Sequence, residues 1–126
     1  MRKVLKTLEL EYTTLEFYEN FVVSQVREDV IFSKSQVYDL AIICSAHYAG
    51  KKYVYISNRV NNYNVDPIVY VQLEKMKKNL YGIGVVINKP STLNMVQFEQ
   101  TFIKTNSNIF FKLEEAMEWA EELLKK

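Results

Sequence analysis

The chain has 126 residues, the usual size of one domain, and nearly half of them are apolar, so it can bury a core without a disulfide or a metal. Sixteen Lys and Arg residues against fifteen Asp and Glu residues leave a formal net charge of +1. Proteins that bind nucleic acids usually carry a clear basic excess, because contacts to phosphate supply most of their affinity. This charge balance therefore argues against a nucleic-acid partner.

The single cysteine, Cys44, has no partner for an internal disulfide, which fits a reducing compartment. The N-terminal segment starts with basic residues but continues with alternating charged residues, where a signal peptide would need an unbroken apolar stretch. No window approaches the roughly 18 apolar residues that a membrane-spanning helix requires. We therefore expect a cytoplasmic protein without stable insertion into a membrane.

The first thirty residues predict a ribbon of two or three antiparallel strands. Apolar and polar residues alternate between residues 8 and 17, with Tyr12 on the apolar side, and this is the period of a half-buried strand. Residues 21–26 form a second apolar segment after a turn at residues 19–20. The unpaired edge of such a ribbon can also pair with a second copy of the chain, so a homodimer stays open.

A helix is predicted over residues 34–49 and a buried strand over residues 53–56. Ser33 and Gln36 have the spacing of a capping box, which marks the start of a helix. Gly50 can take the left-handed conformation that ends one. The strand is a short apolar segment between two polar ones.

A second helix is predicted to begin at Asp66, an N-cap residue followed by Pro67 in the first turn. Its apolar stripe is predicted to end at Leu80. Residues 81–87 are nearly continuously apolar, which is typical of an inner strand covered on both faces.

Ser91 or Thr92 can cap a third helix, on which Met95, Phe98 and Phe102 lie along one side. These three apolar side chains either belong to the core or form a lid over an apolar pocket. Both interpretations stay open at the level of the sequence.

A short strand over residues 109–111 precedes a last helix over residues 113–124, whose five glutamates are predicted to lie on its solvent side. Helices and strands thus alternate through the second half of the chain, which implies right-handed parallel crossovers. The sequence predicts a single α/β domain with a mixed, mostly parallel sheet, an N-terminal antiparallel ribbon and about four flanking helices.

The sequence carries no catalytic or metal-binding motif that we recognise. Its three glycines, Gly50, Gly82 and Gly84, do not form a phosphate-binding loop. Cys44 and His47 lie one helical turn apart, a spacing that can hold a metal, but the sequence supplies no further Cys or His to complete a zinc site. We interpret Cys44 as a core residue and His47 as a helix-face residue near the C-terminal end of the helix, where the free carbonyl groups stabilise a positive charge. We expect no cofactor.

The most informative segment is the predicted loop after the strand at residues 53–56. It leaves the carboxyl end of a parallel strand, where open α/β sheets bind ligands, and the connection after residues 81–87 should emerge at the same edge. Two helix N-termini are expected there as well. The candidate binding residues are Ser57, Asn58, Arg59, Asn61, Tyr63, Asn64, Asp66, Lys89 and Ser91.

Arg59, Lys89 and the backbone N–H groups at this edge would suit a carboxylate or a phosphate. The alternative is that asparagines are simply good turn formers, because their side chains bond their own backbone.

Several segments resemble the SpoIIAA-like branch of the STAS superfamily, namely residues 21–23, residues 53–59 with Asp66-Pro67 after them, and residues 113–119. The resemblance covers essentially the whole chain and implies a mixed sheet flanked by helices and a protein that acts by binding. Anti-sigma-factor antagonists of this type are switched by phosphorylation of a serine at the start of a helix. The corresponding residues 64–67 contain no Ser or Thr, which argues against this switch.

These observations favour a non-enzymatic binding module, regulatory or scaffolding, that contacts a protein partner through Arg59, Asn61 and Tyr63. The alternative is a carrier of a small apolar ligand or a lipid, of the CRAL-TRIO type, with the third helix as a lid. An enzyme is disfavoured, because no nucleophile–base pair or metal cluster can be assembled from the residues available.

Overall fold

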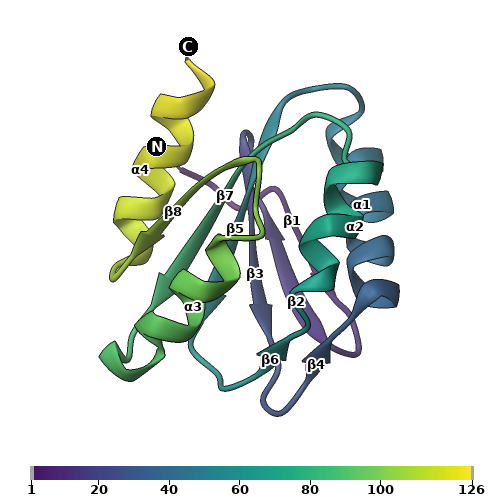
Figure 1. Ribbon diagram of the computed structural model, residues 1–126. Helices are drawn as coiled ribbons and strands as arrows, with labels where there is room; N and C mark the ends of the chain where they lie inside the picture. Colours follow the sequence, from purple (N-terminus) through teal and green to yellow (C-terminus); the bar gives the residue numbers. More distant parts are fainter. Residues whose placement is uncertain (1, 126) are drawn as a thin grey trace.

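A six-stranded mixed sheet lies at the centre of the computed structural model, which describes residues 2–125 (Figure 1). The strand order is β1-β2-β3-β5-β7-β8, with antiparallel pairing from β1 to β3 and parallel pairing from β3 to β8. The strands are β1 (Lys6–Glu9), β2 (Thr13–Phe17), β3 (Phe21–Val26), β5 (Tyr53–Arg59), β7 (Leu80–Ile87) and β8 (Asn106–Phe110). The predicted parallel sheet with an antiparallel N-terminal ribbon is confirmed.

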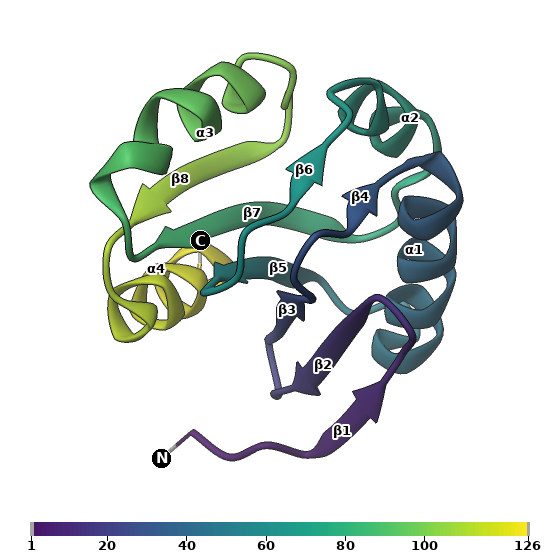
Figure 2. The same cartoon turned by 90° about the horizontal axis from the view of Figure 1, so that it is seen from below.

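Four α-helices form within residues 2–125, and they cover the two faces of the sheet unequally (Figure 2). They are α1 (Lys34–Tyr48), α2 (Ile68–Met76), α3 (Leu93–Gln100) and α4 (Leu113–Leu124), and a 3-10 turn, η1 (Pro90–Thr92), precedes α3. The first three helices pack on one face and α4 on the other. Successive right-handed crossovers that advance in one direction along a sheet place their helices on the same face, which explains the arrangement.

The ends of α1 follow the predicted capping. The side-chain Oε1 of Gln36 accepts a hydrogen bond from the Ser33 N–H at 2.6 Å, which is one half of a capping box. At the other end, Ala49 and Gly50 have φ values of 47° and 92°, so two successive left-handed residues stop the helix.

Close packing of α4 on β7 depends on two glycines. A Cβ atom on Gly82 would lie 2.6 Å from Cδ2 of Leu123, and one on Gly84 would lie 3.2 Å from Cζ3 of Trp119. The absence of side chains at these two positions therefore creates the space that the Trp119 indole fills.

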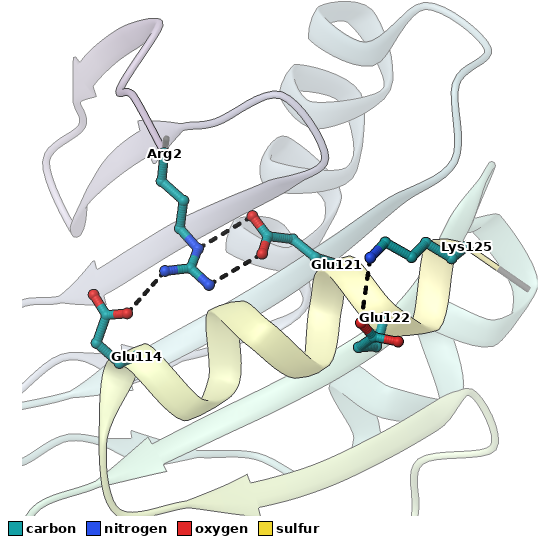
Figure 3. A network of polar contacts seen from close by, with 5 residues as sticks. All are labelled: Arg2, Glu114, Glu121, Glu122 and Lys125. Carbon is teal, nitrogen blue, oxygen red and sulfur yellow. Dashed lines mark hydrogen bonds and ion pairs between the residues drawn. The ribbon is translucent and has the colours of Figure 1, made fainter.

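The segment before β1 is attached to α4 by one arginine (Figure 3). Nε and Nη2 of Arg2 donate to the two carboxylate oxygens of Glu121 at 3.1 and 3.0 Å, and Nη1 donates to Glu114 at 2.8 Å. Two of the glutamates that were predicted to face solvent thus form ion pairs with Arg2, and a third, Glu122, pairs with Lys125 at 3.3 Å. The described chain begins and ends at the end of the sheet away from the carboxyl ends of β3, β5 and β7 (Figure 1).

Several predicted boundaries are wrong, including those of the last strand, which spans Asn106–Phe110 and not residues 109–111. The second helix ends at Met76, because Lys77 is extended and Asn79 adopts a left-handed φ of 63°, and Leu80 is therefore the first residue of β7. Tyr12 lies in the tight turn between β1 and β2, where the Leu10 N–H donates to the Thr13 carbonyl at 2.8 Å.

A separate two-stranded parallel ribbon was not predicted. It consists of β4 (Ile31–Phe32) and β6 (Asn64–Val65), which precede α1 and α2 respectively. Strands of two residues are too short to show an alternating pattern, so the sequence carries no periodic signal for them.

Candidate functional site

A surface groove of about 380 Å³ lies where three neighbouring parallel strands end. The segments that follow β3, β5 and β7 all contribute to it, together with the start of α3, and Nζ of Lys89 lies 3.5 Å from Oδ1 of Asn62. The predicted convergence of the two connections at one edge is therefore confirmed. The groove residues are Asp29, Ile31, Arg59, Asn61, Asn62, Tyr63, Asn64, Asn88, Lys89, Thr92 and Met95.

Arg59 lies in the wall of this groove as the last residue of β5, and it is only 7 % exposed. Its Nη2 donates to both carboxylate oxygens of Glu99, at 3.0 and 3.2 Å, and the Tyr63 ring lies 4.5 Å from its Cζ atom. Nε and Nη1, which carry three of the five guanidinium N–H groups, have no hydrogen-bond partner within residues 2–125. A buried donor without a hydrogen-bond partner lowers the stability of the folded protein by about 1–3 kcal/mol.

Glu99 connects Arg59 to two helices. It projects inward from α3, is 4 % exposed, and also accepts a hydrogen bond from the Tyr70 hydroxyl of α2 at 3.0 Å. Burial raises the pKa of the Glu99 carboxyl, and the Arg59 charge and the Tyr70 hydrogen bond offset only part of this effect. Burial likewise raises the pKa of the Tyr70 hydroxyl. The three side chains thus form a buried polar network between β5, α2 and α3.

Behind Arg59 an internal cavity of about 60 Å³ lies between the sheet and the first two helices, and most of the side chains around it are apolar. Ser57 and Tyr63 lie at the same end of the cavity as Arg59, and their hydroxyl oxygens are 2.7 Å apart. An engineered cavity of about 150 Å³ holds benzene, and this cavity has less than half of that volume, so it suits only a smaller molecule.

The remaining predicted site residues are divided between the groove and local structural roles. Asn61 lines the groove and donates from Nδ2 to the Val26 carbonyl at 3.1 Å. Asp66 accepts a hydrogen bond from the Ile68 N–H at 3.1 Å, which stabilises the start of α2. Asn58 and Ser91 are not among the groove residues, and Thr92 takes the place predicted for Ser91.

The exposure expected of the contact residues needs correction. Ser57, Asn58 and Arg59 belong to β5, not to a loop, and Arg59 and Tyr63 are each only 7 % exposed. A partner therefore cannot use these two side chains as a free contact surface. Groove residues that are exposed include Asn62, Asn64 and Lys89. The structure adds Glu99 and Tyr70, which the sequence analysis missed.

The apolar side of α3 is neither core nor lid. Met95 and Phe98 are 39 % and 58 % exposed, and the helix instead buries Val96 and Glu99. Met95 lines the groove, whereas the internal cavity has no lining residue from α3.

Cys44 and His47 occupy the positions of core and helix-face residues. Cys44 is 2 % exposed, and burial raises the pKa of its thiol to about 12. The His47 ring stacks on Phe17 with centroids 4.2 Å apart, and burial together with nearby Lys6 and Lys51 lowers the pKa of His47. The sequence analysis expected a positive charge on His47 to be stabilised, but its surroundings disfavour that charge.

Two general features of the described chain bear on function. Residues 2–125 contain no group of three or more His, Cys, Asp or Glu side chains that could hold a metal ion. No helix among them has the length and apolar character to cross a membrane.

Comparison with protein-family models finds no match, and neither does comparison with curated proteins. Among solved structures, an uncharacterised DUF3478-family protein from Shewanella loihica PV-4, described as having a SpoIIAA-like fold, superposes with a TM-score of 0.56. The match covers 95 % of each chain at 7 % sequence identity. The chain has a SpoIIAA-like fold. The fold resemblance inferred from the sequence is confirmed, and at this identity the likeness speaks for the fold alone.

Proposed function

We propose that this SpoIIAA-like domain is a non-enzymatic binding module that takes a partner protein at the groove. The observation that carries the proposal is the convergence of segments from β3, β5 and β7 on one concave surface of about 380 Å³. Ligands in open α/β sheets bind at the carboxyl ends of the strands, which is where this surface lies.

The composition of the groove also supports recognition over catalysis. Four asparagines supply both hydrogen-bond donors and acceptors but neither ionise nor act as nucleophiles. Ile31 and Met95, which are 66 % and 39 % exposed, add apolar contact area beside them. A mixture of polar hydrogen-bonding groups and apolar groups suits a surface that binds a protein segment, and the role that we propose for such binding is regulatory or scaffolding.

The experiment is affinity capture with charge-changing variants of exposed groove residues. Asn64→Arg and Lys89→Glu should each remove a specific partner from the captured fraction while leaving the melting temperature unchanged, because both residues are exposed. Lys51→Glu is the matched control, since Lys51 is exposed and precedes the opposite, amino end of β5. A partner captured equally by wild type and both groove variants would contradict the proposal.

A second candidate function, carriage of a small apolar ligand, is supported by the apolar lining of the internal cavity. Its volume of about 60 Å³ has no room for a lipid chain, so the ligand would have to be smaller than benzene. Native mass spectrometry of freshly purified protein tests this function. A single mass equal to that of the bare chain would count against it.

A further inference from the structure

We propose that the groove holds an oxyanion of its ligand, a carboxylate or a phosphate group, between the unpartnered N–H groups of Arg59 and the ammonium group of Lys89. The inference rests on the proposed function, because it names the chemical group that the bound partner presents. The central residue of this anion site is Arg59. It is buried, it lies in the groove wall, and its Nε and Nη1 have no acceptor within residues 2–125.

Glu99 does not use the donor capacity of Arg59 fully. Both of its carboxylate oxygens contact the same nitrogen, Nη2, so the pair is not the two-nitrogen fork that arginine usually makes with a carboxylate. A second oxyanion can therefore bind Nε or Nη1 without displacing Glu99. Planar or tetrahedral oxyanions are the acceptors that best match the guanidinium group.

Lys89 supplies the second cation. Its side chain is exposed and its Nζ makes a long hydrogen bond of 3.5 Å to the Asn62 amide oxygen, so its charge is available to a ligand. One groove residue opposes anion binding, because Asp29 places a carboxylate among the lining groups. Removing this negative charge should therefore tighten binding, whereas removing Lys89 should weaken it.

The segment between β5 and β6 covers Arg59. The Tyr63 ring lies on the guanidinium group, while Val60 and Asn62 in the same segment are exposed, as is Asn64 at the start of β6. A ligand oxygen reaches Nε or Nη1 only when this segment shifts. Anion binding should therefore perturb the backbone of residues 60–64 as well as Lys89.

The test is an NMR titration of the whole chain at low ionic strength with sodium phosphate in one series and sodium acetate in the other. At about 10 mM ligand, which detects millimolar dissociation constants, we expect saturable shifts of the amide signals of residues 60–64 and 88–89. Phosphate and acetate in parallel distinguish the two kinds of oxyanion. Asp29→Asn should lower the dissociation constant about threefold or more and Lys89→Ala should raise it to a similar extent, while Lys51→Ala should change nothing.

Arg59 is tested by the paired variant Arg59→Met with Glu99→Leu, which removes the buried charges together and so avoids an uncompensated carboxylate. A folded double variant that no longer responds to either anion supports the proposal. Absence of shifts in wild type, or shifts that persist unchanged in the double variant, overturns it. If anions fail to bind but partner capture still depends on Asn64, only the anion site is wrong. If anions bind but capture is independent of the groove, the proposed function is wrong.

Discussion

Nη2 of Arg59 lies 3.0 and 3.2 Å from the two carboxylate oxygens of Glu99, and this contact joins the end of β5 to α3 across 40 positions of sequence. Both side chains are more than nine-tenths buried. This charged contact therefore helps to hold α3, and with it one side of the groove, in place, together with the packing of Val96 and the hydrogen bond from Tyr70.

A double-mutant cycle on this pair should be strongly non-additive. Arg59→Met alone or Glu99→Leu alone should lower the free energy of unfolding by about 3–5 kcal/mol, because each leaves a buried group without its partner. The double variant should lose much less free energy of unfolding than the sum of the two single losses, since apolar side chains of similar volume can replace a buried ion pair. Urea denaturation of the four proteins measures the cycle. Additive losses would show that the two groups act independently.

Glu74 should make stability depend on acidity. Its Oε1 accepts the Thr105 N–H and hydroxyl at 2.9 and 2.8 Å, and its Oε2 lies 3.0 Å from Nζ of Lys77. Burial alone would raise the pKa of the Glu74 carboxyl, but the hydrogen bonds from Lys77 and Thr105 lower it below its ordinary value of 4.5. The stability that the carboxylate contributes is thus present above that value and is lost as the pH falls through the lowered pKa.

Glu74→Gln tests this dependence. At about pH 7 the variant should be less stable than wild type by about 1–2 kcal/mol, and the difference should shrink as the pH falls through the lowered pKa of Glu74. Urea unfolding over a series of acidic pH values gives the comparison. A difference that stays constant with pH would show that the charge of Glu74 has no role.

Gly84→Val should displace the only tryptophan of the chain. A side chain at this position would press on the Trp119 ring, so we expect a loss of about 1–3 kcal/mol and a shift of tryptophan emission to longer wavelength. Adding Trp119→Leu should recover part of the lost stability, as measured by circular dichroism. Unchanged emission from Gly84→Val would mean that α4 does not depend on this close approach.

Arg2→Ala should have a small and salt-dependent effect. The Arg2 side chain is 27 % exposed and the Glu114 side chain is 72 % exposed, so the loss of free energy of unfolding should stay below about 1 kcal/mol. The difference from wild type should narrow further in about 1 M salt, because the Debye length is then about 3 Å. Lys3→Ala, which changes an exposed neighbouring cation, is the control for general charge effects.

The sequence predicted the sheet well because period-two alternation and continuous apolar segments are local signals. The parallel pairing of β3, β5 and β7 and the convergence of the segments after β5 and β7 follow from them. The burial of Arg59 does not follow from these local signals. Polar residues at the end of a strand look like the start of a loop, and the carboxylate that allows Arg59 to be buried comes from a helix much later in the chain.

The orientation of α3 was missed for a related reason. Two apolar stripes run along this helix, and the one that faces inward is interrupted by a glutamate, so the stripe through Met95 and Phe98 is the stronger apolar pattern in the sequence. Only the contacts with Arg59 and Tyr70 make Glu99 the inward residue. The signal in the sequence that could have identified Glu99 is a single charged residue within an otherwise apolar stripe, because such a residue is buried only when it is paired.

Because the described chain begins and ends at the end of the sheet away from the groove, a group joined to either end lies away from the proposed binding surface (Figure 1). An affinity tag, a fluorophore or a solid support attached there would leave the groove facing free solution. Anchoring or fusing the domain at either end should thus leave the proposed partner of the groove unobstructed.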